Sequence, residues 1–293
     1  MDEDDPPAKA IARHDRLTDG SHDRRSFMSV MAKLAGSAAA APLLAATVAA
    51  SPAIASIVAE DDKRLDGRMV HWAGAAEHQL FGYMAIPKKH PKKPAAVLVL
   101  HDSRGLQAYT RDVTRRLAVA GFVGLAPDFL APQGGTPTDE DRAGKMIGAL
   151  DLVAATADGV ATINWLSRHR LLNGKVGVVG FGWGGAMADR LAVAAGSALN
   201  ACVAYYGTPP PPAEAGKVKA AVLLHHAGTD DEGDAGTAPW TDALRAAGVD
   251  VRRFDYPGTQ HGFHDDMSAA RYDDAAATLS WARTMTFFRE KLA

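Results

Sequence analysis

Short apolar runs alternate along this chain with longer stretches in which apolar and polar residues repeat at helical spacing. Runs such as residues 95–100 contain no polar side chain, which is typical of strands buried on both faces of a sheet. Stretches such as residues 109–120 place Val113, Leu117 and Ala120 on one side, as an amphipathic helix does. The pattern predicts strands over residues 95–100, 123–126, 176–179, 201–206, 220–225 and 251–256. It predicts helices over residues 109–120, 139–169, 186–195, 238–247 and 270–291.

Two further apolar runs, residues 69–72 and 80–86, precede this series and predict an antiparallel pair of strands that ends at Pro87. Strands that alternate with helices form a doubly wound, mostly parallel sheet flanked by helices, so we predict a single α/β domain. Such sheets bind ligands beyond the carboxyl ends of their strands. The proline- and glycine-containing loop over residues 130–138 follows one of these strands, and we expect it near the functional site.

The first 55 residues have the features of an export signal and not those of the domain. Arg24 and Arg25 precede an uncharged, alanine-rich stretch over residues 34–59, within which Ala53-Ile54-Ala55 offers a small-x-small cleavage site. This combination is typical of a twin-arginine (Tat) signal that is removed after export. We therefore assign residues 1–55 to a signal and residues 56–293 to the domain. The expected location is the periplasm.

A retained membrane anchor is the alternative, because the uncharged stretch is long enough to span a bilayer. Pro42, Pro52 and the excess of alanine over leucine disfavour it. We therefore expect no stable membrane association after cleavage.

The composition is that of an ordinary globular protein, with 293 residues, 47% hydrophobic and 23% charged, and a formal net charge of −2. Without a basic excess, nucleic acid is not an expected partner. Cys202 is the only cysteine, so the exported chain is expected to have no internal disulfide. Its apolar neighbours predict a small buried side chain in place of a reactive thiol.

The most informative stretch joins the predicted strand 176–179 to the predicted helix 186–195. Its centre, Gly180-Phe181-Gly182-Trp183-Gly184, fits the G-x-nucleophile-x-G turn, in which a strained corner lifts one side chain into a catalytic site. Gly182 occupies the nucleophile position, and glycine has no side chain that attacks a substrate. Because glycine adopts strained backbone conformations freely, we expect the turn to persist without its attacking atom.

The same stretch also fits the dinucleotide fingerprint G-x-G-x-x-G through Gly180, Gly182 and Gly185. That fingerprint requires an acidic residue about 20 positions later, and residues 201–207 contain no carboxylate. It also normally opens its domain, whereas here much of the domain precedes it. A dinucleotide-binding module is therefore a disfavoured alternative.

Two candidate catalytic side chains follow later strands. Asp230 comes after the strand 220–225, and His261 comes after the strand 251–256. The order of nucleophile, acid and histidine is that of α/β-hydrolases. In acyl transfer the histidine takes the proton of the nucleophile, the acid orients the histidine, and backbone N–H groups hold the oxyanion. Asp231 is the alternative to Asp230, because its side chain is similarly placed in the sequence.

Four segments of the chain resemble the dienelactone hydrolase family, and together they extend over nearly the whole domain. They are residues 100–105, 179–185, 223–230 and 256–263, the last continuing into 270–273. The resemblance implies an α/β-hydrolase fold and the hydrolysis of lactones and related esters by a Cys-His-Asp triad without a cofactor. It implies Asp230 as the triad acid, His261 as the triad base and Gly182 at the position of the cysteine. The oxyanion donors would be the backbone amides of Trp183 and Ser103.

Asp102 is a second departure from the family pattern. A glutamate that manages the protonation of the thiol usually occupies this position, and aspartate is one methylene shorter. Capping of the following turn is the other interpretation of Asp102, because aspartate commonly has that role.

Other polar residues near these segments allow further interpretations. A metal site would draw on side chains that include His225, His226, His261, His264, Asp265 and Asp266. Because His261 and His264 lie in a loop and lack the helical i, i+4 spacing of a zinc motif, we predict no metal. Arg104 and Arg271 are the best-placed cations for an anionic substrate, although we expect surface positions for both.

The sequence thus supports a hydrolase of small lactones or carboxylic esters whose activity is weakened or lost through Gly182. The alternative is a non-catalytic protein of the same fold that binds a small carboxylated or aromatic ligand.

Overall fold

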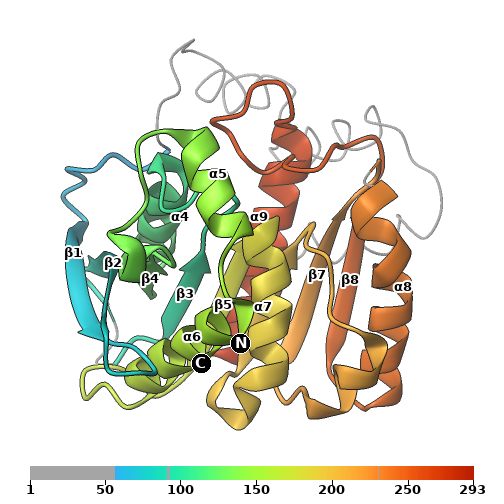
Figure 1. Cartoon of the computed structure of the whole chain (residues 1–293), viewed down its shortest axis with the longest axis horizontal. Coiled ribbons are helices and arrows are strands. Elements are labelled where there is room, and N and C mark those ends of the chain that lie inside the picture. Colours follow the sequence, from blue (N-terminus) through green and yellow to red (C-terminus); the bar gives the residue numbers. More distant parts are fainter. Residues whose placement is uncertain (1–56, 91–92, 230) are drawn as a thin grey trace, which may run out of the picture.

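The described residues, 57–90, 93–229 and 231–293 of the computed structural model, include one eight-stranded sheet (Figure 1). The strand order is β1-β2-β4-β3-β5-β6-β7-β8. β1 pairs antiparallel with β2, and β2 pairs antiparallel with β4, whereas all other neighbours are parallel. The strands are β1 (Leu65–Ala73), β2 (Gln79–Pro87), β3 (Ala96–Leu100), β4 (Val123–Pro127), β5 (Val176–Phe181), β6 (Ala201–Tyr205), β7 (Ala221–Ala227) and β8 (Val251–Tyr256). The predicted antiparallel pair and the mostly parallel sheet are confirmed.

Helices cover both faces of this sheet. The helices are α4 (Ala108–Val119), α5 (Glu140–Gly148), α6 (Leu152–Ser167), α7 (Trp183–Ala194), α8 (Asp231–Ala246) and α9 (Asp274–Lys291). Short 3-10 helices are η1 (Ala131–Gln133), η2 (Gly196–Ala198) and η3 (Pro212–Lys217). α6, α7 and α8 contribute to the apolar cluster on one face, and α4 and α9 contribute to the cluster on the other. This two-sided cover is the doubly wound architecture that the alternating pattern predicted.

β3 shows why the central strands contain no polar side chain. Leu98 and Leu100 belong to the cluster on one face, and Val97 and Val99 belong to the cluster on the other. All four side chains are fully buried. Burial of each is worth roughly 1.5–3 kcal/mol relative to exposure. The central strands are therefore a rigid base for the loops that follow their carboxyl ends. Cys202 lies in this core, as predicted.

The helix predicted over residues 139–169 is wrong in one respect, because the structure divides it into α5 and α6. Asp139 caps the first helix by accepting the backbone N–H of Arg142. Asp151 starts a second helix by accepting the N–H groups of Val153 at 2.8 Å and Ala154 at 3.2 Å. The two N-caps therefore start two separate helices, which bend by 98° where they meet.

Three other helix starts differ from the prediction. α7 begins at Trp183 instead of residue 186, because the helix follows Gly182 without an intervening loop. α9 begins at Asp274 instead of residue 270, because Asp273 caps it by accepting the N–H of Ala276 at 3.0 Å. α8 begins at Asp231, earlier than the predicted residue 238.

Within the described part of the chain, no single helix combines the length and the apolar character needed to cross a membrane. α5 and α6 meet that requirement only as a pair, and they bend by 98° where they join. The predicted signal, residues 1–55, lies outside the described residues and remains a prediction.

Candidate active site

A cavity of about 100 Å³ lies at the carboxyl ends of the strands, where the loops after β3, β5, β6 and β8 meet. Five of the predicted site residues line it, namely Asp102, Ser103, Gly182, Trp183 and His261. Asp230, the predicted triad acid, lies outside the described residues. The structure thus brings together residues that are up to 159 positions apart in the sequence, as predicted for the edge of a doubly wound sheet.

Gly182 forms the corner between β5 and α7. Its backbone has φ +55° and ψ −114°, a conformation that costs a residue with a side chain roughly 1–3 kcal/mol. The corner is held by two backbone hydrogen bonds. The N–H of Gly182 donates to the carbonyl of Tyr205, and its carbonyl accepts the N–H of Ala186, each at 3.0 Å. This is the strained strand-to-helix turn that the glycine pattern predicted.

The other glycines of the turn are required for a different reason, which is close packing of backbone against backbone. A Cβ atom at Gly180 would lie 1.9 Å from the carbonyl oxygen of Gly184. A Cβ atom at Gly184 would lie 2.4 Å from the carbonyl oxygen of Leu100, and one at Gly185 would lie 2.5 Å from that of Tyr205. Only glycine fits at these positions, whereas Gly182 faces the cavity.

His261 stands opposite this corner. Its Nε2 atom lies 3.2 Å from the position that a Cβ atom at residue 182 would occupy. The imidazole packs against the ring of Tyr206, with the ring centroids 4.9 Å apart. Tyr206 itself has a positive φ of 39°, so strained backbone occurs on both sides of the imidazole. A nucleophilic side chain at residue 182 would therefore lie within reach of a histidine base.

The loops that carry residues 230 and 261 are joined just before those residues. The N–H of Gly228 donates to the carbonyl of Tyr256 at 2.9 Å. The N–H and the hydroxyl of Thr229 both donate to the carbonyl of Thr259, at 3.1 and 2.8 Å. Residues 228–229, just after β7, therefore lie beside the segment that leads to His261.

Trp183 and Ser103, whose backbone N–H groups are the predicted oxyanion donors, both line the cavity. Trp183 is the first residue of α7, so its N–H has no partner within the helix and shares the positive end of the helix dipole. Among the described residues, no backbone hydrogen bond outside those within helices and strands is donated by the N–H of Trp183 or of Ser103. The two amides therefore remain the predicted oxyanion donors.

Asp102 serves the turn and the cavity together. Its carboxylate accepts the backbone N–H of Arg104 at 2.8 Å, which is the turn-capping role considered above, and it also accepts Nε of Arg104 at 2.9 Å. The guanidinium of Arg104 reaches on to Asp265 at 2.5 Å. Burial opposes the charge on Arg104, but the two carboxylates outweigh it and raise the pKa of the guanidinium. Arg104 therefore stays charged at the cavity wall.

Arg104 and Arg271 both line the cavity. Arg271 is exposed, as expected, whereas Arg104 is half-buried. Tyr109, Phe181 and Asp265 line the cavity as well, and the sequence pattern did not indicate these positions. Tyr206, whose place in the sequence allowed either an aromatic pocket or core packing, also lines the cavity. Tyr109 lies on α4 and forms a 2.6 Å hydrogen bond with Nδ1 of His264. Burial lowers the pKa of His264 well below its usual value and raises that of Tyr109, so both groups are uncharged.

The histidines considered as metal ligands are dispersed by the fold. His225 lies in β7 and contacts the hydroxyls of Tyr256 and Thr284 at 2.8 and 3.0 Å. Among the residues that the structure describes, no group of three or more His, Cys, Asp or Glu side chains is arranged to hold a metal ion.

A comparison with known protein families supports the same interpretation as the sheet, the turn at Gly182 and the position of His261. The model of the dienelactone hydrolase family matches residues 80–292. This chain belongs to the dienelactone hydrolase family.

Known members extend the comparison. A carboxymethylenebutenolidase, provisionally so named, from Escherichia coli O157:H7 is 30% identical over 230 residues, which cover 71% of this chain and 81% of the relative. A hydrolase fragment from Escherichia coli K12, also provisionally named, is 48% identical over 61 residues. That match covers 21% of this family member and 52% of the fragment.

A solved structure gives the same result for the fold. The crystal structure of a protein provisionally identified as a dienelactone hydrolase from Klebsiella pneumoniae superimposes with a TM-score of 0.67 at 25% identity. The superposition covers 77% of this chain and 99% of the other. The α/β-hydrolase fold of this family member is thereby confirmed.

Proposed function

We propose that this dienelactone hydrolase family member has a site for small lactones or carboxylic esters in which Gly182 replaces the nucleophile. The distance of 3.2 Å between Nε2 of His261 and the Cβ position at residue 182 carries the proposal. In this arrangement His261 is the base, Asp230 orients it, and Asp102 with Arg104 forms the charged wall. The amides of Trp183 and Ser103 hold the developing oxyanion.

Turnover by the wild-type protein is expected to be weak or absent. In a serine-based triad, loss of the nucleophile lowers turnover on the order of a millionfold, and the oxyanion hole with binding retains roughly 10³–10⁴ over water. A water molecule activated by His261 is the nucleophile that remains available for an activated ester.

Introducing the missing thiol tests this proposal. We expect Gly182→Cys to raise kcat/KM for p-nitrophenyl acetate and for dienelactone on the order of 10³-fold or more. Gly182→Ala is the matched control, because it adds the same Cβ atom and backbone strain without a nucleophile. Gly182→Cys combined with His261→Ala should abolish the gain. A folded Gly182→Cys protein with no more turnover than Gly182→Ala would refute the proposed function.

A second candidate is a non-catalytic binding protein for a small carboxylate. Arg104 and Arg271, both at the cavity, favour it because guanidinium groups pair well with carboxylates. Calorimetric titration of wild-type protein with small aromatic carboxylates distinguishes the two candidates. Binding that Arg271→Gln abolishes, together with an inert Gly182→Cys variant, would favour the binding protein. No feature of the site favours the dinucleotide alternative.

We also propose that the protein acts in the periplasm after Tat export, on the basis of Arg24, Arg25 and Ala53-Ile54-Ala55. Sequencing the N-terminus of the periplasmic protein tests this, and the expected first residue is Ser56. Failure of an Arg24→Lys, Arg25→Lys variant to change export would contradict it.

A further inference from the structure

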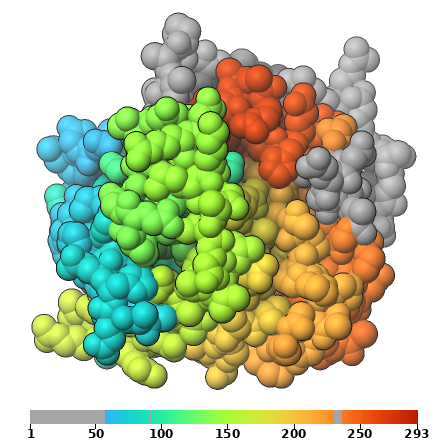
Figure 2. Space-filling model, in the orientation of Figure 1, coloured from blue at the N-terminus to red at the C-terminus, as the bar shows by residue number. Residues whose placement is uncertain are grey.

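The loop that carries His261 is anchored at three successive residues. We call residues 257–273, between β8 and α9, the histidine loop. It lies beside the segment that holds α5 on the face shown in Figure 2. Each anchor comes from the chain between β3 and the end of α4. The pairs are His264 with Tyr109 at 2.6 Å, Asp265 with Arg104 at 2.5 Å, and Asp266 with Arg116 at 2.5 Å. The position of His261 therefore depends on α4 as well as on its own strand.

The third anchor, Arg116, is itself held by a buried carboxylate. Asp112, one turn earlier on α4, has no exposed surface and accepts Nε of Arg116 at 2.8 Å. The Nη2 group of Arg116 contacts both Asp112 and Asp266, so the guanidinium joins the two carboxylates. A shift of Asp112 would therefore be transmitted to Asp266 in the histidine loop.

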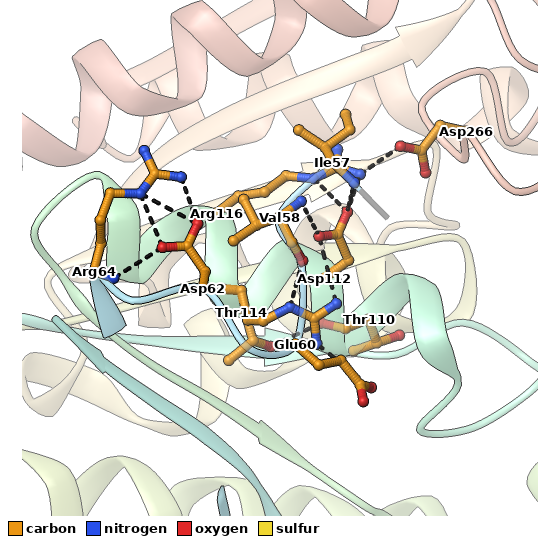
Figure 3. Close-up of polar contacts among 11 residues, drawn as sticks. Ile57, Val58, Glu60, Asp62, Arg64, Thr110, Asp112, Thr114, Arg116 and Asp266 are labelled. Atoms are coloured by element: carbon orange, nitrogen blue, oxygen red, sulfur yellow. Dashed lines mark hydrogen bonds and ion pairs between the residues drawn. The ribbon is translucent and has the colours of Figure 1, made fainter. Parts of the chain in front are cut away.

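Asp112 is positioned in turn by the start of the domain (Figure 3). Its two carboxylate oxygens accept the backbone N–H groups of Ile57 at 3.1 Å and Val58 at 2.8 Å. The carbonyl of Val58 accepts Nε of Arg115 at 2.7 Å. The side chain of Val58 is buried in the apolar cluster beside α4. Residues 57–58 are thus held by three hydrogen bonds and a buried side chain.

A buried carboxylate that loses hydrogen-bond donors must find others, because an unsatisfied charged group in the interior is costly. If the N–H groups of residues 57–58 were absent, Asp112 would have to draw more strongly on Arg116, on Arg115, whose Nη2 lies 3.6 Å from its carboxylate, or on water. Any shift of the carboxylate toward a new donor changes the geometry of the Arg116 guanidinium that holds Asp266.

We propose that residues 57–58 form a latch that positions the histidine loop through Asp112 and Arg116. The catalytic consequence rests on the proposed function, whereas the ordering of the loop does not. Asp112 and Arg116 are positioning residues, since neither lines the cavity.

Hydrogen exchange on the full chain tests the first link. Ile57→Pro removes one N–H donor to Asp112, and Ile57→Ala keeps the donor while removing most of a side chain that is 61% exposed. We expect amide exchange over residues 262–268 to become about 2- to 10-fold faster in Ile57→Pro, as for the loss of one hydrogen bond. Exchange in Ile57→Ala should match that of wild type. Equal exchange rates in all three proteins would overturn the latch.

The second link is tested with Asp112→Asn and Arg116→Gln, and Asp158→Asn is the matched control. Asp158 is also a buried carboxylate that accepts a backbone N–H, from Ala75 at 2.9 Å, and it pairs with His78 at 3.0 Å. It lies on α6, away from the histidine loop. We expect the first two variants to speed exchange over residues 262–268 and the control to leave it unchanged.

The same substitutions in the Gly182→Cys protein separate positioning from general destabilisation. Asp112→Asn and Arg116→Gln should lower kcat about 10- to 100-fold with little change in KM, because a small displacement of a base costs rate more than binding. Asp158→Asn should leave kcat unchanged. Faster loop exchange or a lower kcat in Asp158→Asn as well would overturn the latch. An inert but folded Gly182→Cys protein would refute the proposed function, and exchange alone would then decide the latch.

Discussion

Different interactions hold the two sides of the cavity in place. The turn around Gly182 is held by backbone against backbone, with Gly180, Gly184 and Gly185 at distances that exclude any side chain. The opposite side, the histidine loop, also has internal backbone hydrogen bonds, but its three anchors to the segment between β3 and the end of α4 are side-chain contacts, and two of them are ion pairs. His261 itself remains exposed at the surface of that loop.

This difference indicates how each side responds to change. Close backbone contacts do not depend on pH or salt, and they tolerate no added atom. Ion pairs tolerate changes of shape but depend on charge and its screening. The turn therefore keeps its geometry with glycine at residue 182, whereas the placement of His261 depends on charged residues from distant parts of the chain.

The largest expected effect comes from adding one methyl group to the turn at Gly184. Its Cβ atom would lie 2.4 Å from the carbonyl oxygen of Leu100 and 2.5 Å from that of His101. We expect Gly184→Ala to lower the free energy of unfolding by about 3 kcal/mol, as in other cases of overpacking against backbone. Urea denaturation measures this loss. Gly144→Ala is the control, because its Cβ atom would make only an ordinary contact at 3.7 Å. Equal stability of Gly184→Ala and wild type would contradict the account of the turn.

A smaller effect is expected from removing the cation that joins Asp102 to the histidine loop. Arg104→Gln leaves the carboxylate of Asp265, 5% exposed, without its ion pair. The pair is partly solvated, so we expect a loss of about 2 kcal/mol, less than for a fully buried pair. Thermal unfolding measures it. Arg68→Gln breaks an ion pair in which both side chains are half exposed, and its melting temperature should match that of wild type.

Per pH unit, the smallest expected effect is a pH dependence of stability on the side of the turn. Burial raises the pKa of Asp189, on α7, to about 7, although the nearby Trp240 opposes this shift. The unfolded carboxyl loses its proton near pH 4, while the folded one keeps it to about pH 7. The folded state therefore binds the extra proton in that window, and stability falls as pH rises from about 4 to 7, by at most about 1.4 kcal/mol per pH unit.

Asp189→Asn should remove this contribution. The difference in unfolding free energy between the variant and wild type, measured by urea denaturation, should grow in favour of the variant from pH 4 to pH 7 and then level off. A difference that stays constant over this range would show that Asp189 is ionised in the folded protein.

Much of the fold and part of the site could be predicted because they depend on local patterns. The run 95–100 is apolar throughout since β3 is buried on both faces. The glycine spacing of residues 180–185 indicates the turn because Gly180, Gly184 and Gly185 meet backbone. We could predict that His261, Gly182 and Asp102 lie at one edge of the sheet, because parallel strands direct their carboxyl ends to the same side.

Other features could not be read from the pattern. The division of residues 139–169 into two helices depends on whether Asp139 and Asp151 cap or face solvent, and both outcomes suit the same sequence. Tyr109 pairs with His264 and Arg104 pairs with Asp265, and in each pair the residues are more than 150 positions apart in the chain. Pairs of this kind leave no periodic pattern in the sequence from which they could be predicted.

The sequence by itself determined the alternation of strands and helices, the family and the glycine at residue 182 of the turn, since these follow from side-chain chemistry at short spacing. Only the tertiary structure decided how the histidine is held. That depends on ion pairs and hydrogen bonds between residues 57–58, α4 and the histidine loop. Contacts of this kind exist only once burial has brought distant charges together and removed the water that would otherwise solvate them.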